Sequence, residues 1–126
     1  MPLTTAGRNY MANAIVANPA TLFDTANAHI GVGDSAVGFL DTHTNLQAVT
    51  NKLRKVVDSA PGFGTNVATF VSTFSTSEAN WAWQEWGIFN HVSTGTMLCR
   101  KVESLGTKTS AQSWQITATI TVSIGT

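Results

Sequence analysis

Charge is what this 126-residue chain has least of. Charged residues make up 11% of it, whereas about 25% is typical of soluble domains. Seven basic and seven acidic residues leave no formal net charge, which argues against a nucleic-acid-binding protein that neutralises phosphates. The polar surface must come from Thr, Ser, Asn and Gln, and a surface poor in Lys and Glu suits a protein packed among copies or partners. It suits an ordinary extracellular β protein equally.

Cysteine and long apolar runs are also scarce. The single cysteine excludes an internal disulfide framework, and no run approaches the roughly 18 apolar residues of a membrane span. The opening letters MPLTTAGRNY do not have the pattern of a signal peptide. We therefore expect a protein that is made in a cytoplasm and does not bind membranes. Length and the lack of a linker predict a single domain, 1–126.

Hydrophobic periodicity predicts a mainly β fold with one N-terminal helix. Apolar residues first recur at helical spacing behind a threonine cap, and Asn18-Pro19 should stop the helix, which gives a helix at about 5–18. From 27 to 125 the pattern changes to short segments with period two, separated by turn signals. One helix followed by six or so strands predicts a β-sandwich or barrel-like domain.

The last strand has the clearest pattern. In WQITATITVSI, 114–124, apolar and polar residues alternate strictly, so one face should be buried and the other threonine-rich. The segment LQAVTN predicts a helical turn, and Pro61 to Gly64 predicts a tight turn between strands. The strands NVATFVSTF and KLRKVVDS are apolar on both faces. A domain of this size has little material for a third layer. We therefore expect oligomerisation to cover the second faces.

Catalytic and cofactor patterns lack their partner residues. Gly33-Asp34-Ser35 is similar to the nucleophile block of GDS-type esterases, but no histidine follows His91 to activate the serine. An Asx-type turn is the simpler interpretation. The Gly-x-Gly spacing at 31–33 lacks the helix and the later acidic residue of a dinucleotide site. We therefore expect that the protein is not an enzyme and that it binds no cofactor.

Four residues are candidate soft metal ligands: His29, His43, His91 and Cys99. Their spacings match no zinc pattern, so we expect no metal. His91 and Cys99 could approach each other across a hairpin, which leaves a Cys–His nucleophile geometrically possible. A buried structural cysteine is the favoured interpretation.

Three of the four tryptophans lie in EANWAWQEWGIFN, 78–90. Alternation places Trp81, Trp83 and Glu85 on one face, where an acid among indoles could act as a general acid. Glycoside hydrolysis needs a second carboxylate, and no partner motif is recognisable. A tryptophan platform for sugars is an alternative. We favour packing in the core or at a subunit seam by six residues: Trp81, Trp83, Trp86, Phe89, Trp114 and Ile116.

Glu85 needs a partner if it is buried, because an unpaired buried charge is costly. We expect backbone N–H groups or a basic residue such as Arg100 to hold it. Gly87, two positions later, predicts a bulge or a close approach of another backbone.

Several short motifs follow one another along the chain: TTAGRNYMANAI, Gly31-x-Gly33, Asn51 to Lys55, Glu85 before Gly87 to Asn90, and Met97 to Arg100. This series, which covers nearly the whole chain, resembles small virion structural proteins of tailed bacteriophages. The resemblance implies a β-rich, non-enzymatic building block of the particle, often a homotrimer.

Compact size, the lack of a fibre shaft and an uncharged surface favour a capsid decoration (cement) protein within that group. It would bind the outside of the assembled shell, with itself and the major capsid protein as partners, and reside in the virion. A tail, baseplate or fibre-associated protein is one alternative, and a carbohydrate-binding module using Trp81 to Trp86 is another. Short polar termini can order on a partner, which suggests a capsid-contacting arm: Pro2, Leu3, Thr4, Thr5 and Arg8.

Overall fold

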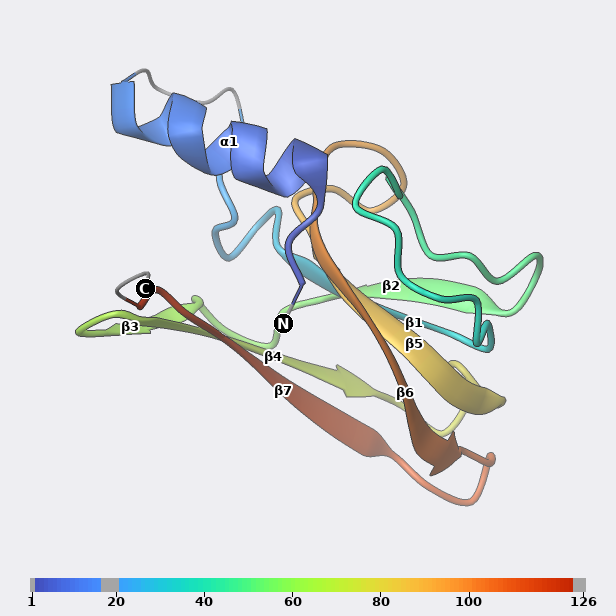
Figure 1. The fold of residues 1–126 in the computed structure, drawn as a ribbon. Coiled ribbons are helices and arrows are strands. Elements are labelled where there is room, and N and C mark those ends of the chain that lie inside the picture. Colours follow the sequence, from blue (N-terminus) through green and yellow to red (C-terminus); the bar gives the residue numbers. More distant parts are fainter. Residues whose placement is uncertain (1, 17–20, 124–126) are drawn as a thin grey trace.

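The computed structural model describes residues 2–16 and 21–123 and shows two antiparallel β-sheets packed face to face, with one helix beside them (Figure 1). The predicted fold class, a mainly β sandwich-like domain with an N-terminal helix, is confirmed. Sheet A has the order β2 (Lys52–Val56), β1 (His29–Gly33), β5 (Ala82–Phe89) and β6 (Met97–Thr107). Sheet B has the order β3 (Gly62–Gly64), β4 (Val67–Phe74) and β7 (Trp114–Thr121).

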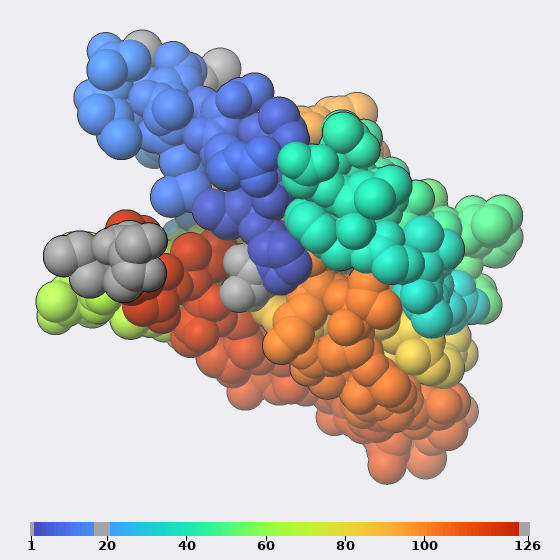
Figure 2. Space-filling model, in the orientation of Figure 1, coloured from blue at the N-terminus to red at the C-terminus, as the bar shows by residue number. Residues whose placement is uncertain are grey.

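The helix α1 (Thr5–Val16) is fastened to the sandwich at its first turn. The Thr4 hydroxyl accepts a hydrogen bond from Gly7 N (2.9 Å) and donates one to the Met97 carbonyl (2.5 Å), so one side chain caps the helix and ties it to β6. Gly7 is buried against the Leu98 backbone, where a Cβ would collide with the Leu98 carbonyl. Met11 still packs against the main core, whereas the end of the helix, from Ala12 to Val16, is exposed and projects from the body (Figures 1 and 2). Its predicted end at Asn18-Pro19 lies outside the described residues.

The main core fills the space between the sheets. Trp83 packs edge-to-face on Phe74 and on Trp114, with ring centroids 5.0 Å apart in both pairs. The alternation predicted for the last strand is present over β7. Trp114, Ile116, Ala118 and Ile120 face the core, and the polar residues between them are exposed. Ile124, at the end of the predicted strand, lies outside the described residues. Other core members come from both sheets: Ile30, Val32, Trp86, Ile88, Phe70 and Ala118.

A third layer covers the outer face of sheet A and corrects one expectation. The loop 34–51 folds over this face, and its Leu46 forms a small apolar cluster with Phe89 and Met97. The chain therefore has material for a third layer over this sheet, and no second subunit is needed to bury it. On sheet B, the outward side chains of β7 are exposed.

Two local predictions are wrong. LQAVTN forms no helical turn, because the N–H groups of Gln47 and Ala48 are bound by the Glu85 carboxylate instead of by helical carbonyls. The segment Gly62–Gly64 is the strand β3 rather than a turn. The chain reverses one step later, at Thr65, whose φ of 50° lies in the left-handed region.

Candidate functional site: the outer face of sheet A

The sequence motifs converge on one place, the outer face of sheet A beneath loop 34–51. The pairing of β1 with β5 sets Gly31 opposite Gly87 and Gly33 opposite Glu85. The pairing of β5 with β6 sets Gly87 opposite Arg100. Because directly paired residues point to the same face of a sheet, motifs that are far apart in the chain share one surface.

Glycines make this surface flat enough to carry large side chains. A Cβ on Gly31 would lie 2.7 Å from the Phe89 ring, and one on Gly33 would lie 2.5 Å from a Glu85 carboxylate oxygen. A Cβ on Gly87 would lie 2.7 Å from the Cys99 carbonyl, so the close backbone approach predicted at this glycine is present. The glycines therefore provide space for the Phe89 ring and the Glu85 carboxylate to lie directly on the strands.

Glu85 holds loop 34–51 through its backbone. Its carboxylate accepts hydrogen bonds from Gln47 N and Ala48 N, both at 2.7 Å, and from Arg100 Nε, also at 2.7 Å. Glu85 and Arg100 are both 0% exposed. The pairing expected from the sequence is thus present, and it satisfies the acid with both kinds of donor that were expected.

Arg100 extends the same network to the other end of the loop. Its Nη2 donates to the Val37 carbonyl at 2.8 Å, and its Nη1 lies 3.5 Å from His43 Nδ1. Burial, and next the nearby Arg100 charge, lower the pKa of His43. A buried ion pair adds little net stability by itself, but removing one partner leaves an uncompensated charge. Loop 34–51 is therefore held in one conformation by a buried pair that reaches both of its halves.

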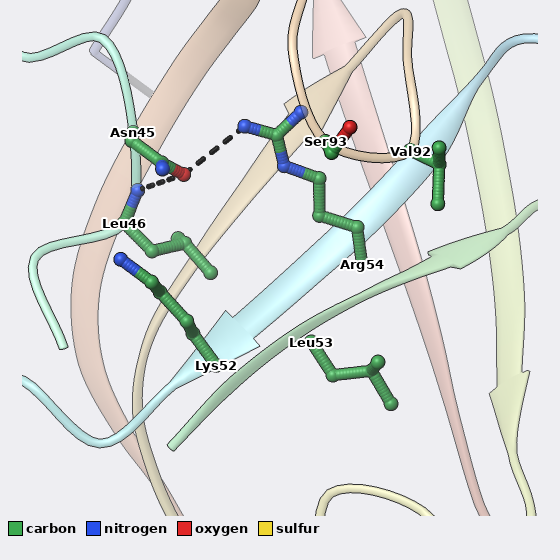
Figure 3. A pocket seen from close by; sticks show the side chains of 7 residues that line it. All are labelled: Asn45, Leu46, Lys52, Leu53, Arg54, Val92 and Ser93. Atoms are coloured by element: carbon green, nitrogen blue, oxygen red, sulfur yellow. Dashed lines mark hydrogen bonds between the residues drawn. The ribbon is translucent and has the colours of Figure 1, made fainter. Parts of the chain in front are cut away.

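Arg54, on β2, lies between loop 34–51 and the turn that follows β5, and Figure 3 shows its guanidinium bound to Asn45. Its guanidinium lies 3.7 Å from the centroid of the Phe89 ring, a cation–π contact. It donates to the carbonyls of His91 (2.9 Å) and Thr94 (2.8 Å) and to Asn45 Oδ1 (3.1 Å). Burial lowers the Arg54 pKa. Because these donors are already bound to the protein, Arg54 is a clamp between two loops and not an open anion site.

The pocket beside Arg54 is small. Its volume is about 250 Å³, below the roughly 300–1,000 Å³ of most small-molecule sites. Its wall combines short aliphatic and polar side chains with two cations: Asn45, Leu46, Lys52, Leu53, Arg54, Val92 and Ser93. The lining contains no carboxylate, thiol or imidazole that could activate the Ser93 hydroxyl.

The side chains of the tryptophan segment, 78–90, do not follow the alternation predicted from the sequence. Trp83 faces the sandwich core, whereas Glu85 faces loop 34–51, so the prediction that they share a face is wrong. The register of β5 against β6 shifts between these two residues, because β5 advances from Trp83 to Glu85 while β6 runs from Gly106 to Val102. An irregular pairing of this kind turns the strand and re-aims its side chains.

The six predicted packing residues all contribute to packing, though unequally. Trp83 is 2% and Trp86 7% exposed, and Phe89 is fully buried. The others are partly buried against the main core: Trp81, Trp114 and Ile116. The Nε1 atom of Trp81 is the one buried side-chain polar atom without a partner among residues 2–16 and 21–123. The further prediction, that some of these residues pack against a second subunit, stays a prediction.

The N-terminal segment is part of the sheet and not a free arm. Leu3 forms a β-bridge with Cys99, and Thr4 is fully buried. Thr5 N donates to the Asp41 carbonyl at 2.7 Å, and Arg8 pairs with the Asp41 carboxylate at 3.3 Å. Of the five residues named as an arm, Pro2 and Arg8 are exposed. A role for them in contacting a capsid stays a prediction.

The candidate metal ligands and nucleophiles lie apart from one another, and their side chains are hydrogen-bonded within the protein or buried. His29 Nδ1 lies 2.7 Å from the Asn27 carbonyl, and His91 Nδ1 accepts hydrogen bonds from the N–H groups of its own turn. Burial raises the Cys99 pKa to about 12, so its thiol stays protonated. Within the described ranges, no group of three or more His, Cys, Asp and Glu residues is arranged to hold a metal ion.

One further buried charge, Lys108, has no signal in the sequence. It is 1% exposed, and its ammonium donates to the Ser75 carbonyl (2.6 Å) and to Asn80 Oδ1 (2.7 Å). A single lysine in a polar stretch after a strand is normally a solvated side chain. Here it ties the segment after β6 to the turn between β4 and β5, and both of its partners are neutral.

The arrangement as a whole holds loops in place. Its charged groups are bound to one another or to backbone atoms. The described segments include no helix long and apolar enough to cross a lipid bilayer. Comparison of the chain with protein-family models, with curated proteins and with solved structures finds no match.

Proposed function

We propose that this protein is a non-enzymatic structural component of a phage particle and that it decorates the outer surface of the capsid shell. The observation that carries the proposal is the exposed end of α1. The end of the helix projects from the sandwich, and Ile15 and Val16 there are 84% and 85% exposed. Its one charged residue is Arg8, at the other end. An apolar, nearly uncharged projection of this kind is suited to insertion between neighbouring subunits.

The locked outer face of sheet A supports the same function. A decoration protein acts by mass action, because a ligand that binds only the assembled lattice stabilises it by RT ln(1 + [L]/Kd) per site. Binding energy is lost if the ligand must first become ordered. The buried Glu85–Arg100 pair and the Arg54 clamp fix the body of the domain, from which α1 projects, before binding, so little of that cost remains.

The first test is the copy number of the protein in purified virions of the phage that encodes it, measured by quantitative mass spectrometry against the major capsid protein. A large, lattice-like ratio supports decoration of the shell. A few copies per particle would assign the protein to the tail, baseplate or a fibre and overturn the capsid location. Absence from the particle would overturn the virion proposal.

The second test addresses α1. Ile15→Asp should weaken binding to shells that lack the protein, because a carboxylate would have to be buried at the contact. Val49→Asp is the matched control, since Val49 is an exposed aliphatic residue on loop 34–51, away from α1. Equal binding by Ile15→Asp and the unchanged protein would show that the end of α1 is not the contact.

No observation favours the carbohydrate-binding alternative. A sugar platform needs indole faces open to solvent, and Trp83 and Trp86 are buried in the core. Titration of tryptophan fluorescence with glycans checks this alternative directly.

A further inference from the structure

The sandwich has four sheet edges, and three of them are protected against pairing with another strand. β2 is short and carries Lys52, Arg54 and Lys55, and β3 has three residues, two of them glycine. β6 is covered at its start by the Leu3 bridge and further on carries the Lys101–Glu103 ion pair (2.7 Å) beside a register shift. Charges, short length, bulges and covering segments are the usual devices that block edge pairing.

The fourth edge, β7, has none of these devices. Its eight residues, WQITATIT, include no charge, proline or glycine, and its pairing with β4 is regular throughout. Its neighbour on one side is β4, and among residues 2–16 and 21–123 no strand pairs with its other side. A long, regular, uncharged edge is the kind of edge that pairs with another chain.

The backbone groups that point outward from β7 can be identified. Val122 N donates to the Asn66 carbonyl at 2.8 Å, in line with the pairing of Val67 with Thr121. Because antiparallel residues bond toward their partner strand at every second position, the even-numbered residues of β7 bond to β4. The odd-numbered ones therefore turn their N–H and C=O groups to the free edge: Gln115, Thr117, Thr119 and Thr121.

We propose that this edge pairs, antiparallel, with β7 of a second copy of the chain, with Ala118 opposite Ala118 on the two-fold axis. In this register Thr117 meets Thr119 of the second copy, and Gln115 meets Thr121. Every outward-pointing backbone group of the strand then has a partner. The two copies of sheet B become one continuous sheet across the dimer.

A groove beside β7 has room for the second copy's side chains. It has a volume of about 380 Å³ and lies between β7 and β6, with Leu3, Trp86 and Lys101 across from residues 117–121. In the proposed register Ile120 of one copy stands opposite Ile116 of the other. These aliphatic side chains face the same side as the groove, so pairing would also cover the edge of the main core near Trp86.

Charge favours a second copy as the occupant. Two β7 strands bring no like charges together, because neither carries any, whereas two β2 strands would bring their basic residues together. The alternation of β7 is also self-complementary, since apolar and threonine faces continue across an antiparallel pair. The pairing does not depend on the proposed virion function, and it predicts a dimer where the phage resemblance implies a trimer.

The test is the molar mass of the purified full chain by light scattering after size exclusion, over a range of concentrations. We expect a dimer, and we expect Thr117→Lys and Thr119→Lys to be monomers, because each places a cation on the edge. Thr69→Lys is the control, since Thr69 lies on the same face of sheet B but on the central strand β4. It should remain a dimer.

Several results would overturn the pairing. These are a monomer or a trimer for the unchanged chain, a dimer that survives both edge substitutions, and loss of the dimer in Thr69→Lys, which would indicate contact through the face of the sheet. The register has its own test. Ala118→Cys should form a disulfide-linked dimer under mild oxidation, because non-hydrogen-bonded antiparallel partners have Cα atoms about 4.5 Å apart. A monomeric Ala118→Cys band beside a dimeric unchanged chain would refute this register.

Discussion

Sheet A and sheet B differ in where they place charge. The strands of sheet A contain seven charged residues, Lys52, Arg54, Lys55, Glu85, Arg100, Lys101 and Glu103, and the strands of sheet B contain none. Sheet A has a second cover in loop 34–51, held by buried charges, whereas in sheet B the outward side chains of the edge strand β7 are exposed.

This difference separates two tasks within one small domain. On sheet A, the buried charges fix the conformation of loops. The charges on the edge strands β2 and β6 protect those edges from pairing with other chains. On sheet B, the lack of charge leaves a surface on which another β-strand meets no repulsion. A chain with few charged residues can therefore be both well ordered and ready to associate, provided that the charges are concentrated on one sheet.

The largest expected effect comes from breaking the lock on sheet A. Glu85→Ala leaves Arg100 buried without its counter-charge and frees the N–H groups of Gln47 and Ala48. We expect the free energy of unfolding, measured by urea denaturation, to fall by about 3–5 kcal/mol. Glu103→Gln is the control, because the Lys101–Glu103 pair is partly exposed on the same sheet and should change stability by about 0–1 kcal/mol.

A double substitution sharpens that result. Glu85→Ala combined with Arg100→Met removes both charges, so the combination should cost less than the sum of the two single changes. Additive losses would mean that the two side chains act independently and that the ion pair is not the unit that holds loop 34–51.

The next effect tests why sheet A needs its glycines and sheet B does not. Gly31→Ala would force the added methyl group against the Phe89 ring, at 2.7 Å, and should cost about 1–3 kcal/mol. Gly62→Ala in β3 meets its nearest atom at 3.7 Å, an ordinary contact. Thermal denaturation of both variants should show a lower Tm for Gly31→Ala alone. Equal Tm values would mean that the Phe89 ring shifts freely and that the surface is not tightly packed.

A smaller effect concerns the ion pair between Lys55 on β2 and Glu78 in the turn that connects the two sheets. The hydrogen bond from Lys55 (2.9 Å), followed by one from Ser75 N, lowers the pKa of Glu78 from 4.5 to about 2. A carboxyl whose pKa is lower in the folded chain adds stability above its unfolded pKa. That stability is lost as the pH falls from about 4.5 to about 2.

Unfolding measured across this pH range checks the point. Glu78→Gln should reduce the slope of stability against pH between about 4.5 and 2, relative to the unchanged chain. Asp41→Asn is a control on an exposed pair with Arg8. A slope that Glu78→Gln leaves unaltered would mean that the Lys55 pair does not persist in solution.

The smallest effect is the expected lack of reaction of the Cys99 thiol, which lies in the main core. Cys99 is fully buried, and its pKa is raised to about 12, so a thiol reagent such as Ellman's reagent should react with it only after denaturation. Rapid reaction under native conditions would show that the start of β6 opens, and with it the Leu3 bridge.

The sequence predicted elements where one physical cause dominated. β7 was predictable because its burial on one face leaves a strict alternation from Trp114 to Ile120, and the pairing of Glu85 because a charge in an apolar strand must be compensated. The faces of Trp83 and Glu85 were not predictable, because a register shift breaks the alternation between them. The loop LQAVTN was not predictable either, since its conformation depends on a carboxylate 37 residues away.

The bridge between Leu3 and Cys99 has a consequence for how the chain is made. The capping residue Thr4 bonds to Met97, 93 residues further along, so the first turn of α1 cannot reach its final place until β6 has been synthesised. During translation, β1 to β5 leave the ribosome before the edge strand that fastens the N-terminus exists. Folding should therefore finish after synthesis, and slowly for a chain of this size, because closing so long a loop precedes the contacts that reward it.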